Sequence, residues 1–123
     1  MRRKNLLITL LCIALVVTGL PCTILAAPAG NIAINSVNFP DDSFRNYIST
    51  YIDSGRKDNK LSQAEIDDVT AMYLGSNAED LTGISYFTNL RILDCSDSKI
   101  THLDVSALTR LVILDCSNCD LVS

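Results

Sequence analysis

The chain has 123 residues, enough for one small domain, and its formal net charge at pH 7 is −4. Three of the ten basic residues lie at positions 2–4, whereas all fourteen acidic residues lie after position 29. Residues 30–123 therefore combine seven basic with fourteen acidic side chains, a net charge of −7. A segment this acidic repels phosphate backbones and anionic lipid surfaces, so the sequence argues against nucleic-acid binding.

The first 29 residues have the pattern of a secretory signal peptide. A basic start at residues 1–4 precedes an almost wholly apolar run at 6–20, and small residues follow at 26–29. The apolar run, about fifteen residues, is shorter than the ~20 that a membrane-spanning helix needs. We therefore expect a secreted or cell-surface protein without a membrane span after cleavage, and an uncleaved anchor is the alternative.

Residues 30–68 have the pattern of a small helical cap. A first helix is expected to start at residues 40–43, Pro-Asp-Asp-Ser, because acidic residues in the first turn suit the helix dipole. A second is expected at Ser62, where Glu65 completes a capping box three residues later. The apolar residues of the first helix recur at helical spacing and predict one continuous stripe: Phe44, Tyr47, Ile48, Tyr51 and Ile52.

The strongest pattern is a repeat with a period of 21 residues. Residues 90–96 and 111–117 align without a gap, as Leu-Arg-Ile-Leu-Asp-Cys-Ser and Leu-Val-Ile-Leu-Asp-Cys-Ser. The run L-x-x-L-x-C-x-x-S-x-I-x-x-L, which begins at Leu90, matches a leucine-rich repeat apart from two substitutions. A degraded copy lies upstream, and its apolar residues precede their counterparts by the same 21 residues: Val69, Met72 and Leu74.

Alternation within each repeat predicts a short strand with two faces. Leu93 and Cys95 would point inward, while Asp94 between them would point outward. One coil cannot bury its inward residues alone, but a stacked coil covers them and pairs its strand in parallel. The predicted fold class is an α/β solenoid, with about two and a half leucine-rich coils after a small helical cap.

The predicted domains follow from these patterns. In chain order they are a signal peptide at 1–29, a helical cap with a degenerate EF-hand-like loop at 30–68, and leucine-rich repeats at 69–123. The repeats divide into an atypical first unit at 69–89, a full unit at 90–110 and a truncated unit at 111–123. Because repeat arrays generally need about three or more units and a cap at each end, we expect further repeats or domains downstream.

Several segments together carry a family resemblance. They are NFPDDSFRNYI at 38–48, KLSQAEI at 60–66 and LTGISYFTNL at 81–90, joined by LDCS at 93–96 and LDVS at 103–106. This combination resembles the N-terminal part of bacterial cell-surface or secreted leucine-rich-repeat proteins, the internalin-like kind common in gut clostridia. The resemblance implies an adhesin-like or matrix-binding role, with more repeats and cell-wall or other domains beyond.

The loop at 53–65 raises the alternative of a calcium-stabilised structural cap of a larger surface protein. The resemblance implies an EF-hand-like loop here, in which Asp53, Asp58 and Glu65 would hold the ion. If Glu65 closes a twelve-residue loop, however, Arg56 takes the third position, where a ligand oxygen is needed. We therefore expect no metal or other cofactor, and a helix–loop–helix in which Glu65 serves the capping box.

Three cysteines, Cys95, Cys116 and Cys119, follow the predicted signal peptide, and an odd number cannot all pair within the chain. Cys95 and Cys116 share one inward repeat position, and Cys119 falls at a turn where such repeats often have Asn or Cys. A metal site would need more ligands, and His102, the single histidine, is expected on the far side of the coil. Buried core thiols are therefore the favoured interpretation.

The outward strand face is the expected binding surface, with the candidate residues Ile92, Asp94, Ser96, Ile113, Asp115 and Ser117. Solenoids usually bind ligands on this concave face, although a solvated face that repeats with the gene is the alternative. No Ser–His pair, Gly-rich phosphate loop or HExxH motif is present, so we expect no enzyme activity. The expected function is an extracellular module that binds a protein or glycan partner. The remaining alternative is a truncated remnant without a function of its own.

Overall fold

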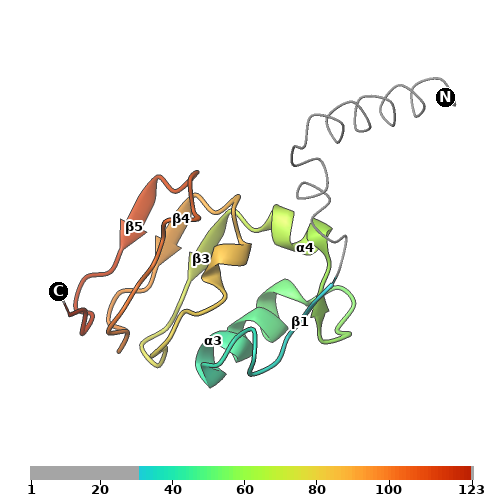
Figure 1. Ribbon diagram of the computed structural model, residues 1–123, viewed down its shortest axis with the longest axis horizontal. Helices are drawn as coiled ribbons and strands as arrows, with labels where there is room; N and C mark the ends of the chain where they lie inside the picture. The colour runs from blue at the N-terminus through green and yellow to red at the C-terminus, as the bar shows by residue number, and fades with distance from the viewer. Residues whose placement is uncertain (1–30, 123) are drawn as a thin grey trace, which may run out of the picture. The chain divides into compact units, whose positions relative to one another are not determined.

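The computed structural model describes residues 31–122, so the signal peptide predicted at 1–29 lies outside the described residues. Figure 1 shows three parallel strands side by side at one end of this unit and the helices at the other. None of the helices in the described part is long and apolar enough to cross a membrane. The elements follow in chain order: β1 (Ile32–Ala33), α3 (Asp42–Tyr47), the π-helical turn η1 (Ile48–Ile52), β2 (Lys60–Leu61), α4 (Gln63–Asp68), β3 (Ala71–Tyr73), the 3₁₀ turn η2 (Ile84–Tyr86), β4 (Ile92–Asp94) and β5 (Ile113–Asp115).

Both predicted helix starts are confirmed. Asp41 caps α3, because its carboxylate accepts a hydrogen bond of 2.6 Å from the backbone N–H of Phe44. Ser62 caps α4, and Glu65 completes the capping box by accepting from the Ser62 backbone N–H at 2.8 Å. In each case a side chain satisfies a backbone group that the first helical turn leaves without a partner.

The expected apolar stripe of the first helix is interrupted at Tyr51, because α3 continues into a π-helical turn. The backbone N–H of Asp53 donates to the carbonyl of Ile48 at 3.0 Å, five residues back, instead of the usual four. The wider turn changes the direction of the side chains that follow. Tyr51 is consequently 68% exposed, so the prediction that it belongs to the buried stripe is wrong, whereas Phe44 and Ile48 are fully buried as expected.

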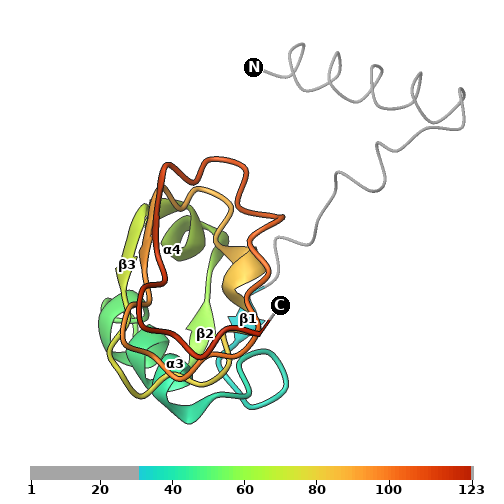
Figure 2. The ribbon, with the colours of Figure 1, turned by 90° about the vertical axis from the view of Figure 1, so that its left-hand side faces the viewer.

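Strands β3, β4 and β5 form a parallel sheet whose register repeats every 21 residues. Met72 pairs with Leu93, and Leu93 pairs with Leu114, so the period read from the sequence is confirmed. In Figure 2, which turns the molecule by a quarter, successive repeats follow similar paths one behind the other. Within residues 31–122 the strands make this small sheet and the antiparallel pair β1–β2, and they do not make a closed solenoid.

The turns after β4 and β5 also match each other. Asp97 and Asn118, 21 residues apart, both have left-handed backbone conformations, with φ of 58° and 56°. The Asn118 amide donates to the Asp97 carboxylate at 2.9 Å, which links the two turns. Asp and Asn tolerate this conformation better than most residues with a Cβ, because their short polar side chains bond locally.

The segment before the repeats packs tightly against the first of them. The ring of Phe39 meets those of Phe44 and Tyr86 edge-on, with both pairs of ring centroids 5.8 Å apart. Gly83 has φ of 99°, and a Cβ there would lie 2.5 Å from the backbone oxygen of Asn38. Only glycine fits this close approach, because it lacks a Cβ and tolerates positive φ. Residues before the repeats therefore pack closely against the first repeat at Phe39 and Gly83.

Candidate binding surface

The outward face of the parallel sheet aligns the predicted binding residues in rows. Ile92 lies beside Ile113, and Asp94 lies beside Asp115, as neighbours in the strand register. Ile113 is 53% exposed, so the apolar row is open to solvent on the outermost strand. The two serines of the predicted set, Ser96 and Ser117, follow the strands by two positions. The structure thus places four of the six residues in one sheet and the two serines just beyond its strands.

The sequence prediction missed that both rows extend onto β3. Ala71 continues the isoleucine row, and Tyr73 continues the aspartate row with its side chain largely exposed. The signal was present, because Tyr73 precedes Asp94 by the same 21 residues that relate the later repeats. It was missed because this degraded repeat carries an aromatic residue where its neighbours carry a carboxylate.

The serines of the predicted set orient the carboxylates next to them. Both the backbone N–H and the hydroxyl of Ser96 donate to Asp94, at 3.0 and 2.7 Å. Ser117 makes the same two bonds to Asp115, at 3.0 and 2.6 Å. The Ser117 hydroxyl, followed by its backbone N–H, holds the pKa of Asp115 below its ordinary value. The Asp-x-Ser spacing therefore fixes the orientation of both carboxylates on this face.

Asp104 shows that the same turn also occurs away from the strands. Its carboxylate accepts from the Ser106 backbone N–H at 2.9 Å, and its pKa is lowered by the Ser106 hydroxyl and backbone. The Asp-x-Ser turn is consequently a local structural device that repeats along the chain. What distinguishes Asp94 and Asp115 is their shared place on the sheet.

The cysteines link neighbouring repeats through hydrogen bonds, and none of the three forms a disulfide. Cys95 is fully buried, as expected, and burial, reinforced by the nearby Cys119 and Cys116, raises its pKa to about 12. The thiol of Cys119 donates to the Cys95 carbonyl at 3.0 Å. Cys116 and Cys119 are only half-buried, whereas His102 is exposed and bonds to Thr101. These contacts fit a packing role for the thiols.

The first half of the 53–65 loop contains one unusual carboxylate. Asp53 is 1% exposed, and one of its oxygens accepts from the Asn59 backbone N–H at 2.9 Å. Its other oxygen has no hydrogen-bond partner among the described residues. Asp58 accepts from the Lys60 backbone N–H at 3.1 Å and is exposed. Only the unpartnered oxygen of Asp53 favours a cation here, because a buried carboxylate normally has its hydrogen bonds satisfied.

In the second half of the loop, the carboxylate of Glu65 serves as a helix cap. One carboxylate oxygen of Glu65 already accepts from the Ser62 backbone and hydroxyl, at 2.8 and 2.7 Å. These bonds, with a smaller contribution from the positive charge of Arg56, lower the pKa of Glu65. In the described part of the chain, no three His, Cys, Asp or Glu side chains are grouped so that they could hold a metal ion. A basic side chain and a capping box thus stand where calcium would need ligand oxygens.

One hollow of the described unit lies away from the strand face. It measures about 710 Å³, and residues from all three repeats line it. Leu114, on the outermost strand, is 40% exposed there. The apolar residues that line the hollow are Leu81, Ile84, Leu103, Val105, Leu114, Leu121 and Val122.

Comparison with known proteins identifies the fold. No protein-family model and no curated protein matches the sequence. Among solved structures, an internalin (InlF) from Listeria monocytogenes is 23% identical, with a TM-score of 0.67 over 76% of this chain and 28% of its own. Internalin C2 (InlC2) from the same bacterium is 26% identical, with a TM-score of 0.65 over 75% of this chain and 41% of its own.

A third solved structure is similar as well. The functional domain of InlJ from Listeria monocytogenes, which includes a cysteine ladder, is 23% identical, with a TM-score of 0.53 over 76% of this chain and 25% of its own. The chain thus spans less than half the length of these three structures. It has their leucine-rich-repeat fold, which confirms the internalin-like resemblance read from the sequence.

Proposed function

We propose that this internalin-like leucine-rich-repeat chain is an extracellular module that binds a protein partner with the outward face of β3, β4 and β5. The observation that carries the proposal is the register that places Ile92 beside Ile113 and Asp94 beside Asp115. An apolar row provides area to bury, and an adjacent acidic row selects partners by charge. The isoleucine row favours a protein over a glycan, because aliphatic side chains offer no hydrogen bonds to sugar hydroxyls.

The other parts of the chain have supporting roles in this proposal. Residues 30–68 act as a helical cap, and residues 69–123 contribute about two and a half coils of a solenoid. The signal-peptide pattern of residues 1–29 supports export to the cell surface or the medium. The net charge of −7 after position 29 supports a partner other than nucleic acid. Neither catalysis nor a cofactor is part of the proposed role.

The test compares binding by the 123-residue chain with binding by two lysine variants, on an array of purified extracellular proteins and a glycan array. Ile113→Lys places a charge in the apolar row, and we expect it to raise the Kd for a bound protein by about tenfold. Ala107→Lys adds the same charge at an exposed position outside the sheet, and should leave the Kd unchanged. Protein binding that tolerates Ile113→Lys, or binding to glycans alone, would overturn the proposal.

A further inference from the structure

Two tyrosine rings lie together where the helical segment meets strand β3. The rings of Tyr47 and Tyr51 lie 5.0 Å apart between centroids, tilted by 44°. The Tyr47 hydroxyl accepts a hydrogen bond of 3.3 Å from the backbone N–H of Tyr73 on β3. Tyr51 and Tyr73 are both largely exposed. The hydrogen bond of Tyr47 therefore joins this aromatic pair to the strand that carries Tyr73.

A groove of about 230 Å³ opens beside these rings, between α3 and the turn that follows β3. Its apolar floor consists of Phe44, Leu74 and Ala78, which are all buried. Tyr47 and Tyr51 line one side of it. A space of this size suits one or two side chains, because pockets for whole small-molecule ligands start at about 300 Å³. The groove therefore fits part of a larger partner.

Acidic side chains surround the neighbouring hollow, which shares Ser43 and Asn77 with the groove. This hollow measures about 460 Å³, and its carboxylates come from both sides of the junction: Asp41, Asp42, Glu79 and Asp80. Asp41 spans the junction, since it also accepts a hydrogen bond of 2.9 Å from the Glu79 backbone N–H. An aromatic groove thus continues into a negatively charged one.

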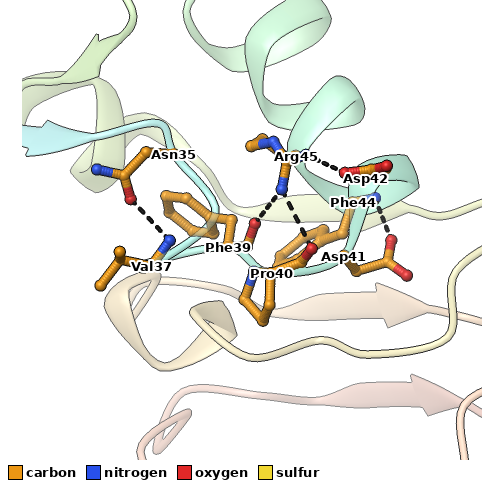
Figure 3. A network of polar contacts seen from close by, with 8 residues as sticks. All are labelled: Asn35, Val37, Phe39, Pro40, Asp41, Asp42, Phe44 and Arg45. Atoms are coloured by element: carbon orange, nitrogen blue, oxygen red, sulfur yellow. Dashed lines mark hydrogen bonds and ion pairs between the residues drawn. The ribbon is translucent and has the colours of Figure 1, made fainter.

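The nearby basic side chains do not neutralise this charge. Arg45 is turned onto the backbone, donating to the carbonyls of Phe39 and Pro40 at 2.7 and 3.1 Å, and it pairs with Asp42 (Figure 3). The ammonium of Lys99 lies 4.0 Å from Glu79, and both side chains are mostly exposed. Two cations therefore face four carboxylates, and the hollow keeps a net negative charge.

We propose that this tyrosine-rimmed groove receives a Lys or Arg side chain from an extended segment of the protein partner. A cation over a tyrosine face is attracted by the ring electrons, and its apolar stem can lie against the groove floor. The carboxylates of the adjacent hollow provide the complementary charge. The inference rests on the proposed function and deepens it, because it names the chemistry that the partner presents at the cap end of the strand face.

The test selects peptides from a displayed library of random dodecapeptides on the 123-residue chain. We expect the selected peptides to be enriched in Lys and Arg over the unselected library. Tyr51→Ser should raise their Kd by roughly tenfold, whereas Tyr51→Phe, which keeps the ring, should change it less than about twofold. Glu79→Lys should raise the Kd of basic peptides and lower that of acidic ones. Val37→Ser is the matched control, since Val37 is an exposed apolar residue outside the groove.

Each contrary result has a definite meaning. Peptides without a basic excess, peptides that tolerate Tyr51→Ser, or a library that yields no binder would overturn the groove proposal. Sugar binding on a glycan array that is lost with Tyr51→Ser would also overturn it, because the occupant would be a glycan. If a protein on the array loses affinity with Ile113→Lys and not with Tyr51→Ser, the result would support binding by the strand face and overturn the groove proposal. The reverse pattern would support the groove and overturn the strand face.

Discussion

The same five residues, Ile-Leu-Asp-Cys-Ser, occur at 92–96 and at 113–117, yet their surroundings differ. Leu93 is fully buried, whereas Leu114 at the equivalent position is 40% exposed. The difference arises because β4 has a strand on each side and β5 pairs only with β4. Burial in this chain is therefore a property of the neighbouring repeat as much as of the residue itself.

Truncating the two equivalent leucines should give the largest contrast. We expect Leu93→Ala to lower the free energy of unfolding by about 3 kcal/mol, since it removes buried methyl groups and leaves a cavity. Leu114→Ala should cost about 1 kcal/mol or less, because that side chain is already partly in water. Urea unfolding of the 123-residue chain and both variants measures the difference. Equal losses of unfolding free energy in the two variants would contradict the difference in burial between Leu93 and Leu114, and would show that β5 is covered in solution.

The equivalent cysteines should differ in reactivity. Cys95 is buried and its pKa is about 12, so almost none of it is thiolate at pH 8. Cys116 is half-buried on the edge strand. We expect iodoacetamide to modify Cys116 roughly a hundredfold faster than Cys95, as read from peptide masses. In urea the two rates should converge, which is the control. Comparable rates without urea would indicate that β4 opens as readily as β5.

The turn after the exposed strand β5, in which Ser117 bonds to Asp115, can also be tested. Ser117→Ala should raise the pKa of Asp115 toward its ordinary 3.8, because it removes the hydroxyl that stabilises the carboxylate. Since the folded pKa lies below the unfolded one, this interaction stabilises the fold above about pH 3.8 and is lost as pH falls through the folded value. Carbon-13 NMR titration of the carboxyl group measures the shift. An unchanged pKa of Asp115 would mean that the backbone N–H of Ser117 alone lowers it.

The smallest expected effect is that of calcium on the Tm, through the loop at 53–65 that precedes the repeats. We expect millimolar calcium and excess chelator to give the same Tm for the 123-residue chain, since Glu65 and Arg56 occupy the loop as a capping box and a fixed positive charge. Circular dichroism melts with each addition provide the measurement. A Tm that rises with calcium would show that the unpartnered oxygen of Asp53 binds the ion, and that the metal stabilises this loop.

The parts of the fold that depend on repetition were readable from the sequence. The inward strand residues Leu93 and Cys95 have equivalents 21 positions away in Leu114 and Cys116, so register and sheet order followed from alignment alone. The exposed position of Tyr51 was not readable, because a stripe drawn at 3.6 residues per turn cannot anticipate a π-helical turn. The β1–β2 pair was also missed, since strands of two residues leave no alternation to detect.

The candidate binding surface likewise contains residues that the repeat pattern located and residues that it did not. The strand positions of Ile92 and Asp94 follow from a repeat that is intact in the sequence. The groove beside Tyr51 joins residues from two separate segments, 43–51 and 74–78, which only the folded chain brings together. Hydrogen bonds such as the one between Asp41 and the Glu79 backbone depend on that packing, so no local sequence pattern predicts them.

The linked turns at Asp97 and Asn118 have a consequence for how such a chain changes during evolution. Each turn supplies its own left-handed residue and bonds to the equivalent turn of its neighbour, 21 positions away. A tandem duplication of one whole repeat would copy the turn, the strand and the link together, so the added unit arrives ready to stack. Insertions of other lengths would force an ordinary residue into the left-handed position. Gain or loss of 21 codons at a time would therefore preserve the fold. Each added repeat would lengthen the strand face without changing its geometry.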